Sequence, residues 1–391
     1  MKTNLSSISN YFCMTRTDIR MVDLSSQYAR IKPEIDQAIA RTLESTRFIG
    51  GEQVETFSEN LEKYLQVPHV ITCANGTDAL QIAMMALNLR PGDEIIVPAF
   101  TYVATAEVVA LLDLTPVMVD VDPNTFNIDI DSIRNAITEQ TKAIVPVHLF
   151  GQSSQMDDIS QIAKEHNLFV IEDTAQAIGA QFSFPEGENR AVGTIGDFGT
   201  ISFFPSKNLG CYGDGGCLVT HDDKLAKRAK MIANHGQSRK YYHKIVGMNS
   251  RLDAIQAGVL DVKLKYLDEF AAKRQAVADT YDQHLHSLDG IKIPYRSSCS
   301  SHVFHQYTIQ VADGRRDELK SYLQSKGIPS MIYYPLPLYD QEAFAKYYLG
   351  EKMMHTERLC KEVLSLPIHT EMPTDQQEYI INHITSFFEG Q

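Results

Sequence analysis

The chain has 391 residues, of which 43% are hydrophobic and 22% are charged. This composition is typical of a globular protein with a large apolar core, and the length favours two or three domains. Lys and Arg number 36 against 49 Asp and Glu, so the formal net charge is −13. A nucleic-acid-binding protein is not indicated, because such a protein would present a basic surface.

Membrane insertion and secretion are not indicated either. No apolar run reaches the length of a membrane helix, and the polar N-terminal stretch lacks the apolar segment of a secretory signal. The six cysteines are scattered without Cys-x-x-Cys spacing, and Cys211 and Cys217 flank a glycine-rich turn without a histidine nearby. We therefore predict a cytoplasmic protein with reduced thiols and no metal site.

The first two thirds of the chain alternate between helical and strand patterns. Residues 1–20 are polar and aperiodic, which predicts a flexible leader, and two amphipathic helices are expected from Gln27 and over 54–65. Short apolar runs follow at 70–72, 94–97, 117–120, 143–147 and 169–171, separated by helical segments. Such runs indicate strands covered on both faces, so we predict an α/β domain with a mostly parallel sheet and helices on both faces.

The pattern changes after about residue 249. Residues 250–285 predict one long helical stretch, and further helices are expected near 315–326, 341–360 and 375–388, with an apolar run at 303–311. We predict a large domain over 21–265 and a smaller C-terminal α/β domain over 266–391. Because ligands of parallel α/β sheets bind at the carboxyl ends of the strands, the loops there should carry the chemistry.

Two strand ends carry polar residues that suit a ligand. Gly76 and Thr77 lie between a strand and a helix, where the glycine allows close approach and the threonine offers a hydroxyl and an amide to an anion. Taken alone, this pattern is also an ordinary helix start. Asp173 ends a buried strand, where a carboxylate needs a cationic partner unless it only caps a helix, and Gln176 follows one turn later.

A lysine lies in the apolar and glycine-rich segment Ser-Phe-Phe-Pro-Ser-Lys-Asn-Leu-Gly, which covers 202–210. Burial there would disfavour the ammonium form of Lys207, as an amine requires if it is to attack a carbonyl. Ser202 lies five residues before this lysine. Together with the strand-end Asp173 and the upstream Gly-Thr pair, this arrangement indicates a pyridoxal phosphate (PLP) site.

The motifs resemble those of the DegT/DnrJ/StrS-type nucleotide-sugar aminotransferases, which are fold type I PLP enzymes. The resemblance runs from about Met21 to about His383 and rests on the motifs CANGTDAL, PAFTYVAT, VIEDTAQAIGA, SFFPSKNLGCYGDGGCLVT and GMNSRLDAIQAGVL. Within the family the chain is most similar to WbpE-like 3-aminotransferases, which act on UDP-2-acetamido-2-deoxy-3-oxo-glucuronate. The resemblance thus implies transfer of an amino group from glutamate to this keto sugar, for surface polysaccharide synthesis.

The resemblance also implies roles for residues around the coenzyme ring. Lys207 would hold PLP as a Schiff base, and Asp173 would pair with the pyridine nitrogen. Gln176 would contact the ring hydroxyl, and Tyr102 would stack on the ring.

A second group of residues would hold the coenzyme phosphate. The resemblance implies this role for Gly76, Thr77 and Ser202, with Asn249 reaching in from a partner subunit. The active unit would therefore be a homodimer with shared active sites.

The identity of the sugar stays open. Arg239 and Arg251 are candidate cations for a sugar carboxylate or a diphosphate. The family commonly has His-Tyr-Pro near the sugar where this chain has Tyr333-Tyr334-Pro335. The alternatives are a dTDP-3-oxo- or dTDP-4-oxo-6-deoxyhexose aminotransferase and, in another class, a non-catalytic regulator that binds PLP or a sugar nucleotide; Lys207 disfavours the regulator.

Overall fold

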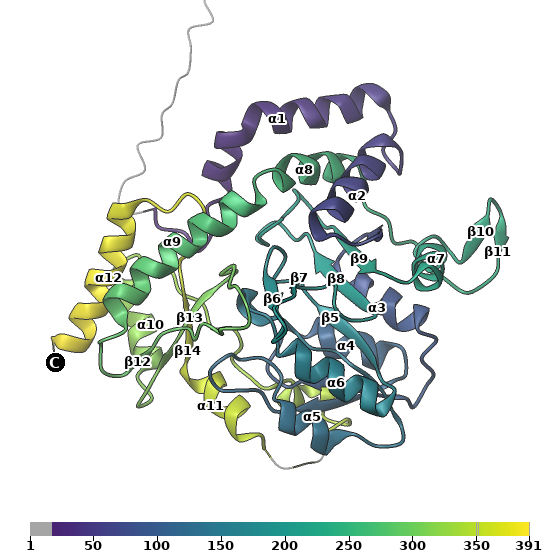
Figure 1. Cartoon of the computed structure of the whole chain (residues 1–391). Coiled ribbons are helices and arrows are strands. Elements are labelled where there is room, and N and C mark those ends of the chain that lie inside the picture. Colours follow the sequence, from purple (N-terminus) through teal and green to yellow (C-terminus); the bar gives the residue numbers. More distant parts are fainter. Residues whose placement is uncertain (1–17, 349, 351, 391) are drawn as a thin grey trace, which may run out of the picture.

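The computed structural model describes residues 18–348, 350 and 352–390. A seven-stranded sheet lies at the centre of the larger part of the molecule (Figure 1). Its strand order is β1 (His69–Cys73), β9 (Gly216–Thr220), β8 (Phe198–Ser202), β5 (Phe169–Asp173), β4 (Thr141–Ile144), β2 (Glu94–Pro98) and β3 (Thr115–Val119).

The sheet is mostly parallel. Strand β2 pairs in parallel with β3 and β4, β4 pairs with β5, and β5 pairs with β8, whereas β9 runs antiparallel to its neighbours β8 and β1. The neighbouring strands β5 and β8 therefore end at the same edge, which brings Asp173 and Ser202 to one side of the sheet.

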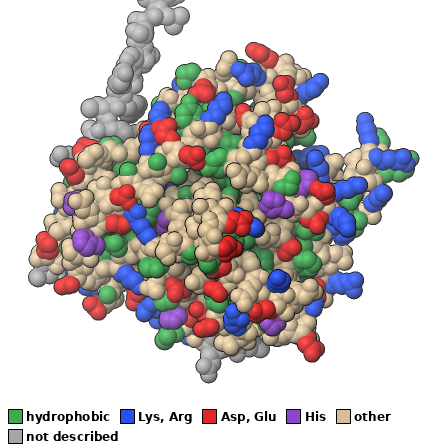
Figure 2. All heavy atoms as spheres, in the orientation of Figure 1, with side chains coloured by type: hydrophobic (Ala, Val, Ile, Leu, Met, Phe, Trp, Pro, Cys, Tyr) green, Lys and Arg blue, Asp and Glu red, His purple; other side chains and the backbone are tan. Residues whose placement is uncertain are grey.

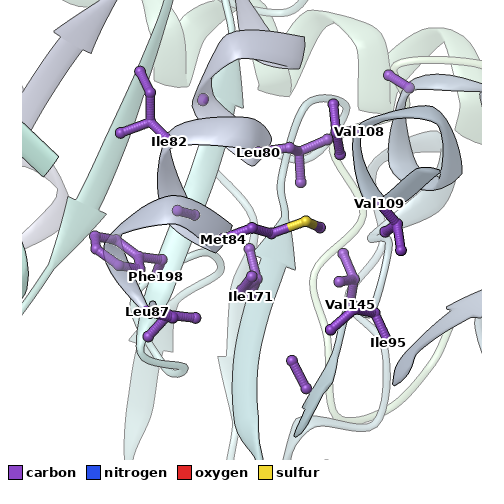
Figure 3. Packing of buried hydrophobic residues seen from close by; sticks show 14 of the residues in the cluster. Leu80, Ile82, Met84, Leu87, Ile95, Val108, Val109, Val145, Ile171 and Phe198 are labelled. Carbon is purple, nitrogen blue, oxygen red and sulfur yellow. The ribbon is translucent and has the colours of Figure 1, made fainter. Parts of the chain in front are cut away.

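Helices α3 (Gly76–Ala86), α4 (Ala104–Leu111) and α7 (Asp223–Ile232) cover one face of the sheet. Figure 3 shows Leu80 and Met84 of α3 packed close to Ile171 of the sheet, with Val108 and Val109 of α4 alongside. The strands read as nearly continuous apolar runs because both of their faces are buried.

The opposite face is covered by α5 (Ile130–Ala136) and α6 (Met156–His166) over one half, and by α2 (Glu52–Leu65) and α8 (Ala254–Leu264) over the other. The N-terminal helix α1 (Leu24–Ser45) packs on α8. A small hairpin, β6 (Gln181–Ser183) and β7 (Asn189–Ala191), follows β5. A second hairpin, β10 (Gln237–Arg239) and β11 (Tyr242–His243), projects from the body of the molecule (Figure 1).

The C-terminal part contains a three-stranded antiparallel sheet, β12 (Ile291–Lys292), β13 (Tyr307–Val311) and β14 (Val363–Leu366). Helices α9 (Leu267–Leu285), α10 (Arg316–Ser325) and α12 (Thr374–Glu389) enclose its apolar cluster, and α11 (Met354–Glu362) precedes β14. This part is tied to the large sheet: the Asp120 carboxylate, just after β3, accepts hydrogen bonds from the backbone N–H groups of His355 and Thr356 at 3.0 and 2.8 Å.

The α/β class with a large, mostly parallel sheet is confirmed, but two helix predictions were wrong. The single stretch over 250–285 is two helices, because at Lys265 and Tyr266 the backbone makes tighter bonds to Val262 and Lys263, three residues back. The region 341–360 holds the short 3₁₀ turn Glu342–Phe344 and then α11, because Phe344 and Tyr347 pack on the main core instead of forming a helix face.

The domain boundaries at 20 and 265 stay predictions. Most of the predicted leader lies outside the described residues, and of residues 18–20 Ile19 is buried in the C-terminal cluster. Across the described ranges, no helix combines the length and apolar character needed to cross a membrane.

Candidate active site

A cavity of about 710 Å³ opens at the carboxyl ends of β5 and β8. Its walls come from the start of α3, the segment before α4, the turn after β8, and residues 305–306 and 333–334. The nine predicted site residues that line it are Gly76, Thr77, Tyr102, Asp173, Gln176, Ser202, Lys207, Tyr333 and Tyr334. Segments far apart in the sequence therefore meet in one site, and the functions assigned to these residues remain proposals.

The turn that carries Lys207 is held by one internal bond and by bonds to two other parts of the chain. Within the turn, the Lys207 amide donates to the Phe204 carbonyl at 2.8 Å. The Asn208 side chain donates to the Val303 carbonyl at 3.0 Å, and the ammonium of the buried Lys263 donates to the Gly210 carbonyl at 2.7 Å. The lysine therefore extends from a rigid base into the cavity.

Burial lowers the pKa of the Lys207 amine to about 8, although the negative charge of Asp173 acts in the opposite direction. An ordinary lysine has a pKa near 10.4 and is almost fully protonated at neutral pH. Desolvation thus makes the neutral, nucleophilic form of this amine accessible near pH 8.

Asp173 is 6% exposed, and its carboxylate accepts two hydrogen bonds from the described residues. The Thr105 hydroxyl donates to Oδ2 at 2.9 Å, and the Ala175 amide donates to Oδ1 at 3.2 Å. Burial raises the pKa of this carboxyl, while Thr105, Ala175 and the charge of Lys207 oppose the rise. A carboxylate in this setting has unused acceptor capacity that suits a cationic N–H group in the cavity.

The neighbouring acid, Glu172, is fully buried and has no such capacity. Its two oxygens accept the backbone N–H groups of Gly193, Ile195 and Gly196 at 2.7–2.8 Å, and Oε2 lies 3.0 Å from His148 Nε2. Successive side chains of a strand point to opposite faces. Glu172 therefore serves the loop that follows the β6–β7 hairpin, and Asp173 is left for the cavity.

The start of α3 forms an anion cup beside β8. Asn75 caps the helix, accepting the Asp78 amide at 2.8 Å, so the first amides of the helix are available to a ligand. A Cβ at Gly76 would lie 2.7 Å from the Cβ of Ser202, so only glycine permits this approach. The Asp78 carboxylate is bound by the Ser250 hydroxyl at 2.6 Å, which ties the cup to the segment before α8.

Gln176 holds the opposite wall together. Its Oε1 accepts the Phe150 amide at 2.8 Å, and its Nε2 lies 3.3 Å from the Tyr334 hydroxyl. The rings of Tyr102 and Tyr334 lie 6.3 Å apart, and Tyr102 is 57% exposed. These residues form an aromatic side of the cavity.

Three predicted residues lie outside this cavity in the single chain. Arg239 is on the projecting hairpin, where its guanidinium lies 3.7 Å from the centre of the Tyr242 ring. Asn249 forms an isolated bridge with Asn234, and Arg251 lines a separate hollow beside α2 and β1. The structure therefore does not bring them to the chain's own site.

Sequence reasoning missed Thr105, Glu172 and His305. Thr105 belongs to the TYVAT segment, and nothing in its local sequence indicates a role. Its contact with Asp173 joins residues 68 positions apart in the chain. His305 lies in a segment predicted only as an apolar run, yet it lines the cavity. The position of this histidine inside an apolar run was the sequence feature that could have indicated a functional role. In the described part of the chain, no group of three or more His, Cys, Asp or Glu side chains is arranged to hold a metal ion.

The cavity fits PLP. The cup that Gly76 makes possible offers helix amides to a phosphate, Lys207 offers an amine of lowered pKa to an aldehyde, and Asp173 offers an incompletely paired carboxylate to a ring N–H. All three line one cavity.

Comparisons with known proteins agree with this reading. Residues 29–385 match the DegT/DnrJ/EryC1/StrS aminotransferase family. A UDP-2-acetamido-2-deoxy-3-oxo-D-glucuronate aminotransferase of Pseudomonas aeruginosa is 43% identical, covering 94% of this chain and 100% of that protein. A pleiotropic regulatory protein of Geobacillus stearothermophilus is 45% identical, covering 95% and 99%. The crystal structure of Streptomyces venezuelae DesV in complex with a ketimine intermediate has a TM-score of 0.91 at 38% identity, covering 95% and 98%.

The chain belongs to the DegT/DnrJ/EryC1/StrS aminotransferase family. It is a PLP-dependent nucleotide-sugar aminotransferase with the fold type I architecture, as the motifs predict.

Proposed function

We propose that the protein transfers the amino group of glutamate to UDP-2-acetamido-2-deoxy-3-oxo-glucuronate and produces the 3-amino sugar nucleotide. The transaminase chemistry is supported by one observation: Lys207, Asp173 and the anion cup line the same cavity. The choice of this sugar is supported by the Pseudomonas relative, which is similar over its whole length.

Lys207 performs two tasks in this reaction. Its neutral amine binds the coenzyme, and after the amino donor has displaced it, the same amine moves a proton at the reacting carbon. PLP, when bound, stores the amino group between the two half-reactions and delocalises the charge that develops on the substrate carbon. The lowered pKa of Lys207 suits both tasks, because the amine must accept and return a proton near neutral pH.

Asp173 keeps the ring nitrogen protonated. The hydroxyl of Thr105 and the amide of Ala175 hold the carboxylate in place and favour its ionised form. Its negative charge in a buried site would stabilise a protonated ring nitrogen when PLP is bound.

The diphosphate of the sugar nucleotide needs cations that the cavity of one chain does not supply. Among the described residues that line it, Lys207 is the only Lys or Arg, whereas Asp78, Asp173 and Asp214 are acidic. Lys and Arg side chains gather instead on the projecting hairpin (Figure 2), where Tyr241 is 79% exposed. We therefore propose a homodimer in which Arg239, Arg251 and Asn249 of one subunit complete the site of the other.

A half-reaction assay tests the function. With glutamate alone, the protein loaded with PLP should release about one 2-oxoglutarate per site, because each turnover stops until a keto sugar removes the amino group. Lys207→Ala should bind PLP without this release. The exposed Lys265→Ala serves as a matched control and should behave like the native protein.

The acceptor is tested in a second step. The aminated enzyme is offered the UDP-keto-sugar and, in parallel, dTDP-3-oxo- and dTDP-4-oxo-6-deoxyhexoses. Faster amination of a dTDP sugar would reject the proposed acceptor and keep the transaminase, whereas failure of the glutamate step would reject the transaminase itself.

A further inference from the structure

His305 is a buried side chain with an unpaired polar atom at the cavity. It is 5% exposed, it lines the cavity, and its Nδ1 has no hydrogen-bond partner among the residues that the structure describes. Other buried side chains in the described ranges also have an unpaired polar atom, among them Thr174, Asn208 and His369, but none of these lines this cavity. A buried, unpaired polar atom costs about 1–3 kcal/mol, so its position against a ligand cavity requires an explanation.

The backbone around His305, not a bond to its ring, fixes its position. The buried guanidinium of Arg274 donates to the carbonyls of Phe304 and Ile368 at 3.2 and 3.0 Å and lies 3.5 Å from the carbonyl of His305. The backbone amide of Phe304 donates to His302 Nδ1 at 3.0 Å. The backbone thus holds the imidazole at the cavity wall, and none of the described residues pairs with its Nδ1.

Two strained segments meet at this point. Phe304 has a φ of 45° and Phe150 a φ of 59°, which are unfavourable for residues other than glycine. Between them, Gly151 has a φ of 110°, and a Cβ there would lie 3.0 Å from the amide nitrogens of Phe304 and His305. Strain of this kind persists where the surrounding structure imposes it, and it clusters at binding sites.

The ring is neutral. Burial and the positive charges of Lys207 and Arg274 hold the pKa of His305 well below its usual value. A neutral imidazole carries one N–H donor and one acceptor nitrogen. A hydroxyl group, which both donates and accepts, can therefore pair with either ring nitrogen, whereas a carboxylate can only accept.

We propose that His305 binds a hydroxyl group of the keto sugar while it reacts at Lys207. This inference rests on the proposed transamination, in which two different molecules enter the same cavity in turn. Glutamate bears carboxylates and no hydroxyl. Its carboxylates cannot pair with the acceptor nitrogen of the ring, whereas a sugar hydroxyl can pair with either nitrogen. We therefore assign the bond from His305 to the sugar half-reaction.

The test compares the two half-reactions in the holoenzyme. For His305→Phe, we expect the kcat/KM of the sugar step and the calorimetric affinity for the 3-amino sugar nucleotide to fall about 10- to 100-fold, because a bond to a buried polar group is lost. The rate of the glutamate step and the retention of PLP should change less than about twofold. This is the usual variation when a mutated residue does not contact the group that is measured. His305→Asn, which keeps a polar atom near the position of Nδ1, should restore part of the affinity.

His369→Phe is the matched control. His369 is also a buried histidine with an unpaired Nδ1, but it lies outside the cavity, so the sugar step should stay native. Three results for His305→Phe would each overturn the inference. They are equal losses in both half-reactions, weaker retention of PLP, and an unchanged sugar step. A native enzyme that fails with glutamate would instead overturn the proposed function, and the calorimetric comparison would still decide the role of His305.

Discussion

The surroundings of Lys207 and Asp173 shift the pKa values of both side chains. Burial lowers the pKa of the amine and raises the pKa of the carboxyl, so each group is pushed toward its neutral form. Their mutual attraction and the Thr105 hydroxyl act against this push. Burial thus disfavours the charged form of both groups, and the hydrogen bonds and the opposite charge favour it.

This balance predicts how the protein without coenzyme takes up PLP. Only the neutral amine attacks an aldehyde, so with a Lys207 pKa of about 8 the uptake rate should rise about tenfold per pH unit below that value and level off above it. Asp173→Asn removes the negative charge that raises this pKa, so the plateau should begin at lower pH. Stopped-flow absorbance at several pH values measures both curves. A plateau that starts only near pH 10, or one that moves upward in Asp173→Asn, would contradict the assignment.

The sequence predicts the site residues that lie in motifs, but it does not predict the residues that hold them in place. Lys207, Asp173 and Gly76 stand in local patterns of apolar residues and glycines that constrain their chemistry. The bond from Thr105 to Asp173 and the place of His305 depend on contacts between distant segments. No local pattern encodes such contacts.

Among the elements, the approach of α3 to β8 decides whether a phosphate can bind. The helix start is pressed against Ser202, and the space that a side chain would need at Gly76 is already filled. The cup therefore depends on the spacing between a helix and a strand that are more than 100 residues apart in the chain.

Gly76→Ala should weaken PLP binding more than it weakens the fold. The added Cβ would displace the start of α3 from Ser202 and misalign its amides, so we expect the dissociation constant for PLP to rise about tenfold or more. The free energy of unfolding should change by only about 1 kcal/mol, because alanine also favours the helix. Fluorescence titration with PLP and urea unfolding separate the two effects.

Gly258→Ala in α8 is the control for this change. A Cβ there meets nothing closer than 3.6 Å, so PLP affinity should remain native and stability should rise slightly. If Gly76→Ala bound PLP as tightly as Gly258→Ala, the helix start would not be the phosphate site.

Elements were predicted best where both faces of a strand are buried. The runs at 94–97 and 169–171 became β2 and β5, because continuous apolar sequence has few other uses in an α/β sheet. The break between α8 and α9 and the turns before α11 were not predicted. At the break between α8 and α9, tighter backbone bonds to residues three positions back interrupt a helical pattern that continues in the sequence. Before α11, packing of Phe344 and Tyr347 on the remote main core has the same effect.

At the scale of the whole molecule, the net charge is −13, so the Lys and Arg residues of the projecting hairpin contrast with the average charge of the chain. Figure 2 shows acidic and basic side chains mixed over the body of the molecule and Lys and Arg side chains on the projecting hairpin. This hairpin suits the proposed second copy, whose cavity has Lys207 as its one Lys or Arg among the described lining residues. The sequence pointed to this loop as a local exception in charge, but only the fold shows that it lies away from the cavity of its own chain.

Mixed dimers test the shared site. We expect coexpressed Lys207→Ala and Asn249→Asp chains to regain activity, because one of the two sites in a mixed dimer would receive both native residues. A Lys207→Ala and Asp173→Asn mixture should stay inactive, since both residues belong to the cavity of the same chain. Activity of the purified mixed dimers, separated by two affinity tags, is the measurement. Equal activity of the two mixtures would refute sharing.

The bonds from Asp120 to the start of α11 have a consequence for biosynthesis. Asp120 follows β3, an edge strand of the large sheet, and its partner Thr356 lies 236 residues further along the chain. During translation, these bonds cannot form until nearly the whole polypeptide has left the ribosome. A nascent or truncated chain would therefore lack this link between the large sheet and the C-terminal part, and late docking of this kind favours intermediates that expose apolar surface.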